Sequence, residues 1–124
     1  MIPLVEVEEM RMKEIETISE EEFEQRVLGT EKPVLVEFGA VWCGPCKRLE
    51  PELARLSQEW GDRLEILSVD VDEASDLAMQ FMVLSVPTLI LFQNGEAVKR
   101  MSGFQPLQRL KETLEPYLVV HPQD

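Results

Sequence analysis

The sequence contains two cysteines, and both lie in the stretch Trp42-Cys43-Gly44-Pro45-Cys46. Two thiols at this spacing can form an intramolecular disulfide. Such a bond encloses too little chain to stabilise a fold, because the loop-closure contribution grows with the length of the loop. A reversible, redox-active disulfide is therefore favoured. The alternatives are two inert buried thiols or half of a zinc site, although zinc prefers four ligands and the only histidine is His121.

The segments on either side of the cysteines place them where a strand ends and a helix begins. Residues 34–38 form a nearly unbroken apolar run, which is typical of a strand that is buried on both faces. Apolar residues then recur at helical spacing, at Leu49, Leu53, Leu56 and Trp60. A helix N-terminus stabilises a thiolate and lowers a cysteine pKa from about 8.5 toward neutrality. This predicts a reactive Cys43.

The sequence resembles the thioredoxin family from about Glu14 to Leu118. The resemblance is carried by the WCGPC motif after a buried strand, and by Val86-Pro87-Thr88 about forty residues later. Strand-helix-strand units imply parallel pairing, and a later hairpin adds antiparallel strands. We therefore expect an α/β protein with the thioredoxin fold, in which a central mixed β-sheet is flanked by helices on both faces.

The chain order of the expected elements agrees with this fold. A strand is expected at residues 15–18, followed by a helix that begins with the capping box Ser19-Glu20-Glu21-Glu22. Pro51 is expected to kink the helix at residues 45–60. A strand at residues 64–71 precedes a short helix that Asp72 can cap. The turn Asn94-Gly95 predicts a hairpin of residues 88–93 and 96–101, and the last helix starts near Pro106.

We expect one domain with two short additions. Residues 14–119 form the thioredoxin domain, and residues 120–124 form a C-terminal tail. Residues 1–13 lie outside the resemblance and alternate weakly between apolar and polar types. We predict a flexible N-terminal extension there; an added edge strand or a dimer contact are the alternatives.

Charge and composition narrow the classes of function. The net charge of −12 argues against nucleic-acid binding, which depends on lysine and arginine. No apolar run is long enough for a membrane helix. The first residues have no basic region typical of a secretory signal, and the cysteine usage suits a reducing cytoplasm. The acidic residues are concentrated in the first 31 positions. They form either a solvated surface or a charged region that steers the chain toward a basic partner.

The chemistry assigns different roles to the two cysteines. Cys43, at the helix start and expected to be more exposed, would attack a substrate disulfide. Cys46, one turn further and expected to be more buried, would resolve the mixed disulfide. Glu37 is the one charged residue in its strand, and by resemblance it is the proton relay for Cys46. The alternative is a Glu37 that reaches solvent at an edge.

Thioredoxins usually carry an aspartate where this sequence has Glu37, and two positions near it also depart from the family pattern. Ser68 replaces a lysine that many thioredoxins carry, so we expect Glu37 to be protonated more often at rest. Gly39 replaces a large aromatic residue, and this loss is expected to loosen packing beside the site.

The resemblance also implies a binding surface for substrates. Thioredoxins hold the proline at position 87 in the cis form opposite the cysteines, which leaves the Val86 backbone free to pair with an extended substrate. An apolar patch around the cysteines would contain Trp42, Gly44, Pro45, Val86, Pro87, Gly103 and Phe104. For Trp42, a packing role alone is the alternative.

These features predict a protein-disulfide reductase that maintains cell redox homeostasis and carries electrons in the cytoplasm. We expect a monomer with no bound cofactor and no metal, which an NADPH- or ferredoxin-linked thioredoxin reductase recharges. Its substrates would be proteins with disulfides. The alternatives are a disulfide oxidase or isomerase of the same fold, which Glu37 suggests, or a binding module that does not turn over.

Overall fold

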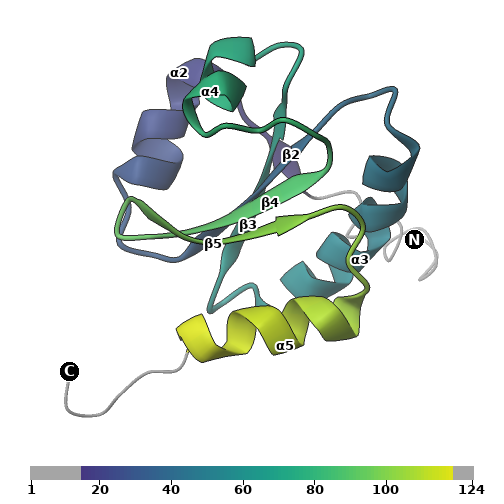
Figure 1. Ribbon diagram of the computed structural model, residues 1–124. Helices are drawn as coiled ribbons and strands as arrows, with labels where there is room; N and C mark the ends of the chain where they lie inside the picture. Colours follow the sequence, from purple (N-terminus) through teal and green to yellow (C-terminus); the bar gives the residue numbers. More distant parts are fainter. Residues whose placement is uncertain (1–14, 119–124) are drawn as a thin grey trace, which may run out of the picture.

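A five-stranded mixed sheet forms the centre of the computed structural model, which describes residues 15–118 (Figure 1). The strands lie in the order β1-β3-β2-β4-β5. They span Glu16–Thr17 (β1), Val34–Gly39 (β2), Glu65–Asp70 (β3), Thr88–Gln93 (β4) and Glu96–Ser102 (β5). β3 pairs in parallel with β1 and β2, while β4 pairs antiparallel with β2 and β5. The expected mixed sheet is confirmed; the predictions for residues 1–13 and 120–124 lie outside the described residues.

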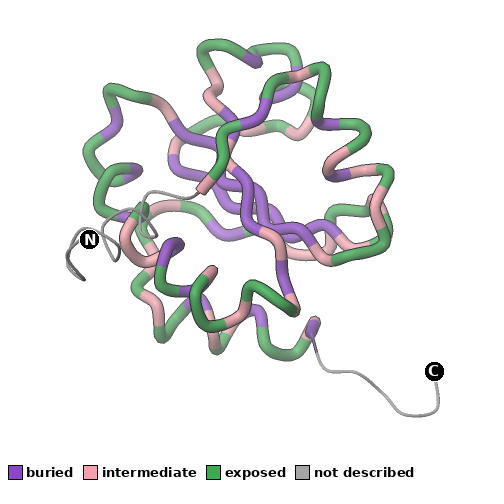
Figure 2. Tube along the Cα trace, turned by 180° about the vertical axis from the view of Figure 1, so that it is seen from behind, coloured by how far each residue is buried: buried purple, intermediate pink, exposed green. Residues whose placement is uncertain are grey.

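Helices cover both faces of the sheet, as expected. One face packs against α2 (Glu20–Phe23), the π-helical turn η1 (Glu24–Leu28) and α4 (Ser75–Gln80), with Phe23, Val27 and Leu77 in its core. The other face packs against α3 (Gly44–Trp60) and α5 (Leu107–Leu118). The buried residues in Figure 2 run along the sheet between these two layers. Within residues 15–118, no helix combines the length and apolar character that a membrane crossing requires.

Local sequence signals fix most of the predicted elements. Ser19 caps α2, and its capping box with Glu22 forms as expected. The hairpin turn has positive φ angles at Asn94 (51°) and Gly95 (80°), which suits a two-residue turn between right-twisted strands. α3 contains Pro51 inside the helix.

The predicted cap of α4 is wrong. The helix begins at Ser75, and its N-cap is Ala74, whose side chain makes no capping hydrogen bond. The backbone N–H groups of Glu73 and Ala74 both donate to the carbonyl of Asp70, so a turn separates β3 from the helix. This turn places Asp72 too early in the chain to cap α4.

The alternation of side chains along β2 determines which residues face the start of α3. Val34, Val36 and Phe38 belong to the core beneath α2 and α4. Leu35 belongs to the core beneath α3 and α5, and successive strand residues point to opposite faces. Glu37 and Gly39 therefore lie on the α3 face of the sheet, at the end of β2 from which the chain leaves toward the cysteines.

Candidate active site

A disulfide joins Cys43 and Cys46 at the N-terminus of α3, with the two Cα atoms 5.3 Å apart. Cys43 is the N-cap residue and has an extended backbone (φ −89°, ψ 113°). The backbone N–H of Cys46 donates to Sγ of Cys43 at 3.2 Å. This N–H and the positive end of the helix dipole therefore face the sulfur, which favours its thiolate after reduction.

The predicted difference in exposure between the two cysteines is wrong. Each exposes 4% of its surface. The disulfide holds the sulfur of Cys43 against the first turn of α3, where Cys46 is buried, so the two atoms share one environment. The expected order of attack therefore depends on the N-cap position of Cys43, whose sulfur accepts the backbone N–H of Cys46.

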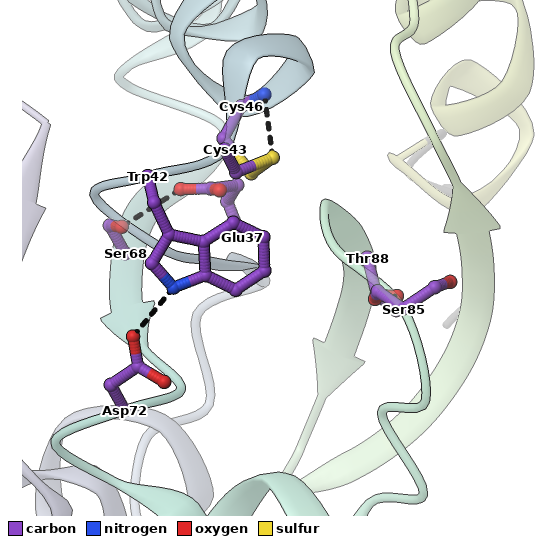
Figure 3. The surroundings of a disulfide bond; sticks show 8 residues. All are labelled: Glu37, Trp42, Cys43, Cys46, Ser68, Asp72, Ser85 and Thr88. Carbon is purple, nitrogen blue, oxygen red and sulfur yellow. Dashed lines mark hydrogen bonds between the residues drawn. A yellow bond between two sulfur atoms is a disulfide. The ribbon is translucent and has the colours of Figure 1, made fainter.

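Glu37 is a buried carboxylic acid that accepts a hydrogen bond from the neighbouring strand β3. It is 5% exposed, so the alternative of an edge position that reaches solvent is wrong. The Ser68 hydroxyl donates to its Oε1 at 2.8 Å (Figure 3). Burial is the main cause that raises the pKa of Glu37 from 4.5 to about 7; the Ser68 hydrogen bond opposes this rise, and Glu50 and Asp70 add to it.

This pKa suits Glu37 to move protons at neutral pH, because an acid–base group works best when its pKa lies near the ambient pH. A substantial fraction of the protein would hold the proton and the rest could accept one. The direction of this shift is the one expected where no lysine lies beside Glu37, and its protonation at rest stays a prediction.

The peptide bond between Val86 and Pro87 is cis, as the resemblance implied. β2 and β4 are antiparallel, with Phe38 opposite Thr88. Pro87, which directly precedes β4, therefore lies next to the end of β2 that leads to the cysteines. Two hydrogen bonds hold this segment: the Gly103 N–H donates to the Pro87 carbonyl at 2.8 Å, and the Thr88 hydroxyl donates to the Ser85 carbonyl at 2.7 Å.

The residues of the predicted substrate patch differ in exposure. Trp42 is 68% exposed and Phe104 is 42% exposed, and Gly44 and Pro45 are also exposed. Val86 and Gly103 are half-buried, and Pro87 is buried. Sequence reasoning missed Val41, whose apolar side chain is 71% exposed next to Trp42. Two exposed apolar neighbours before the cysteines were visible in the sequence as Val41-Trp42.

Asp72 anchors the exposed indole ring of Trp42, a role that sequence reasoning missed. Nε1–H of Trp42 donates to Oδ2 of Asp72 at 2.8 Å (Figure 3). Asp72 follows β3 and Trp42 follows β2, and these strands are parallel neighbours. Because their carboxyl ends meet at one edge of the sheet, the two loops come together there.

We expect an Asp72→Ala substitution to free the Trp42 side chain. The lost hydrogen bond is worth about 0.5–1.5 kcal/mol, enough to allow rapid motion of an exposed ring. Fluorescence anisotropy decay in a Trp60→Phe background should then show added nanosecond motion. Asp72→Asn retains an acceptor oxygen and serves as the control. An unchanged decay in Asp72→Ala would mean that other contacts hold Trp42.

Comparisons with known proteins agree with this geometry. A family model described as Thioredoxin matches residues 14–116. The chain is 39% identical over 102 residues to a thioredoxin of Alicyclobacillus acidocaldarius, which covers 82% of this chain and 96% of that protein. It is 44% identical over 89 residues to a thioredoxin of Bacillus subtilis, covering 72% and 86%. With a chloroplastic M-type thioredoxin of spinach, it is 35% identical over 107 residues, covering 86% and 59%.

Proposed function

From the premise that this chain belongs to the thioredoxin family, we propose how its residues divide the work of disulfide reduction. The chain is a protein-disulfide oxidoreductase that cycles through a Cys43–Cys46 disulfide. One observation supports the division of roles most directly: a helix N-terminus faces the sulfur of Cys43, while a buried acid with a raised pKa lies on the strand beneath.

The proposed reaction has two exchange steps. The thiolate of Cys43 attacks one sulfur of a substrate disulfide, and the other sulfur leaves as a thiolate. Cys46 then attacks the sulfur of Cys43 in the mixed disulfide, which releases the second substrate thiol and leaves Cys43–Cys46 oxidised. Two electrons pass from the protein to the substrate. Glu37 accepts the proton of the Cys46 thiol, so that Cys46 attacks as a thiolate.

The substrate would lie over the exposed surface around the disulfide. Trp42 and Phe104 offer apolar contact area, and Gly44 lets a substrate backbone approach closely. The backbone of Val86, a half-buried residue, would pair with an extended substrate segment.

The remaining parts of the proposal concern the partner and the compartment. We propose that a thioredoxin reductase, NADPH- or ferredoxin-linked, returns the disulfide to the dithiol, and that no bound cofactor is needed. We place the protein in the cytoplasm, because two cysteines in one redox motif suit a reducing compartment. We propose that it acts there as a monomeric electron carrier.

Reconstitution with each class of reductase tests the partner. The oxidised chain is mixed with a disulfide-bonded protein and either an NADPH-linked or a ferredoxin-linked thioredoxin reductase. We expect one system to reduce the substrate in step with the oxidation of its electron donor. If neither reductase reduces Cys43–Cys46, the proposed partner is wrong.

A second candidate, disulfide oxidation or isomerisation, is favoured by the glutamate at position 37. The reduction potential of Cys43–Cys46 separates the two candidates. Thioredoxin itself has a potential of about −270 mV and protein disulfide isomerase about −180 mV, so a value near the first supports the reductase and one near the second supports the alternative.

A further inference from the structure

Gly39 and Glu37 compete for the same space on the α3 face of the sheet. They are two positions apart on β2, so their side chains would point to the same face. A Cβ atom added at Gly39 would overlap Oε2 of Glu37 and would lie 3.0 Å from its Cδ. The same atom would lie 3.3 Å from Sγ of Cys46. The carboxylate therefore occupies the place of the missing side chain, next to the resolving cysteine.

The other oxygen of the carboxylate is held from the neighbouring strand. Ser68 is the register partner of Glu37 on β3, and its hydroxyl donates to Oε1 at 2.8 Å. Oε1 thus binds Ser68 while Oε2 lies over the backbone of Gly39. The orientation of the carboxylate depends on both residues.

Glu37 has neighbours on α3, β3 and β4 and a pocket beside it. α3 contributes Cys46 and Glu50, and β3 contributes Ser68 and Asp70. On β4, the register partner of Glu37 is the apolar Leu89. A pocket of about 120 Å³, partly open to solvent, adjoins Glu37, Gly39 and Cys46. No basic side chain of the described residues lines this pocket.

We propose that Gly39 is a positioning residue, whose lack of a side chain lets the carboxylate of Glu37 lie beside Cys46 with access to the pocket. The inference rests on the proposed proton relay and adds the residue that makes it possible. A glycine at position 39 and a glutamate at position 37 form a matched pair. The carboxylate of Glu37 can occupy the space above residue 39 because a glycine places no side chain there.

The matched pair predicts how substitutions combine. In Gly39→Ala the carboxylate must move, and it can do so without a backbone shift because it is the far end of a flexible side chain. The adjoining pocket, which is partly open to solvent, offers it a more solvated position. An aspartate at position 37 is one methylene shorter, so the double variant Glu37→Asp/Gly39→Ala should accommodate both side chains.

The test compares Gly39→Ala, Glu37→Asp and the double variant, with Gly29→Ala as the matched control. Gly29 also gains one methyl group, but its neighbours are backbone atoms of Glu24 and Gln25. The pKa of the carboxyl at position 37 is followed by ¹³C NMR in the oxidised proteins. The pH profile of the step in which Cys46 releases a bound substrate thiol is followed by stopped flow.

We expect Gly39→Ala to lower the pKa of Glu37 by about one unit or more, because the carboxylate becomes more solvated. The release step should slow by about tenfold or more at neutral pH, and the double variant should recover most of that loss. A pKa of Glu37 equal in Gly39→Ala and Gly29→Ala would overturn the inference.

Two outcomes separate this inference from the proposed relay. If Gly39→Ala shifts the pKa of Glu37 without changing the release step, Gly39 positions the carboxylate but Glu37 is not the relay. If Glu37→Gln slows the release step while Gly39→Ala changes neither the pKa nor the rate, the relay holds and the inference is wrong.

Discussion

Replacement of Cys43 by serine is expected to abolish the reduction of protein disulfides, with a loss of at least about a thousandfold in turnover. A serine hydroxyl is not ionised at neutral pH and cannot form a disulfide with Cys46. The N–H of Cys46, which donates to the sulfur at 3.2 Å, would donate instead to a neutral hydroxyl, and this hydrogen bond does not ionise the hydroxyl. Steady-state reduction of a disulfide-bonded protein measures the effect.

Cys46→Ser is the matched variant and should fail in a different way. Cys43 remains at the helix N-terminus and can still attack, so one substrate molecule should become trapped as a mixed disulfide. A non-reducing gel would show this adduct for Cys46→Ser and not for Cys43→Ser. The reverse pattern would mean that Cys46 is the attacking cysteine and Cys43 the resolving one. The equal exposure of the two cysteines does not itself decide between these assignments.

The fold could be predicted from the sequence because its main signals are local. The apolar run of β2 matches a strand in which every residue is buried, between helices on both sides. The Ser19 capping box and the Asn94-Gly95 turn each depend on neighbours within a few residues, and both form. Such signals do not need knowledge of the tertiary structure.

Asp72 was mispredicted because its partner is distant in the sequence. Its position before a helical pattern favoured a cap, but the hydrogen bond forms with Trp42, thirty residues earlier in the chain. The register of β2 and β3 brings the two loops together, and no local pattern contains that information. The start of α4 also lacks a side-chain cap, so no local signal marks it.

The relation between Gly39 and Glu37 shows what the sequence alone leaves out at the site. Each residue departs from the family pattern, and the sequence suggested loosened packing at Gly39. The structure instead fills that space with the carboxylate of Glu37, beside Cys46. Alternation along a strand predicts that the two residues share a face, but only the side-chain conformation shows that they share one volume.

The second large effect expected is a loss of stability of the oxidised protein as the pH rises from about 4.5 to about 7. The folded-state pKa of Glu37 is raised from 4.5 to about 7, chiefly by burial. In this interval the folded protein binds more protons than the unfolded chain, so the free energy of unfolding falls as the pH rises. A shift of this size corresponds to about 3 kcal/mol. Urea unfolding at pH 5 and pH 8 measures it.

Glu37→Gln isolates this contribution, because the amide keeps the shape and an acceptor for the Ser68 hydroxyl but carries no charge. The variant should match the native protein near pH 4.5 and exceed its stability by about 3 kcal/mol at pH 8. The other carboxylates are common to both proteins and cancel in the difference. An equal difference at pH 5 and pH 8 would mean that Glu37 titrates normally in the folded state.

Glu16→Gln provides a control of opposite sign. The hydrogen bond from Arg26 is the main cause that lowers the pKa of Glu16, so its contribution is present at neutral pH and is lost as the pH falls. Glu16 is exposed, and its effect should be small.

Two measurements on Glu37→Gln together would show why the buried acid is retained. The variant should be more stable than the native protein at pH 8 and should release bound substrate more slowly. Burial of Glu37 costs stability because the ionised carboxylate is desolvated, but it keeps a titrating group beside Cys46.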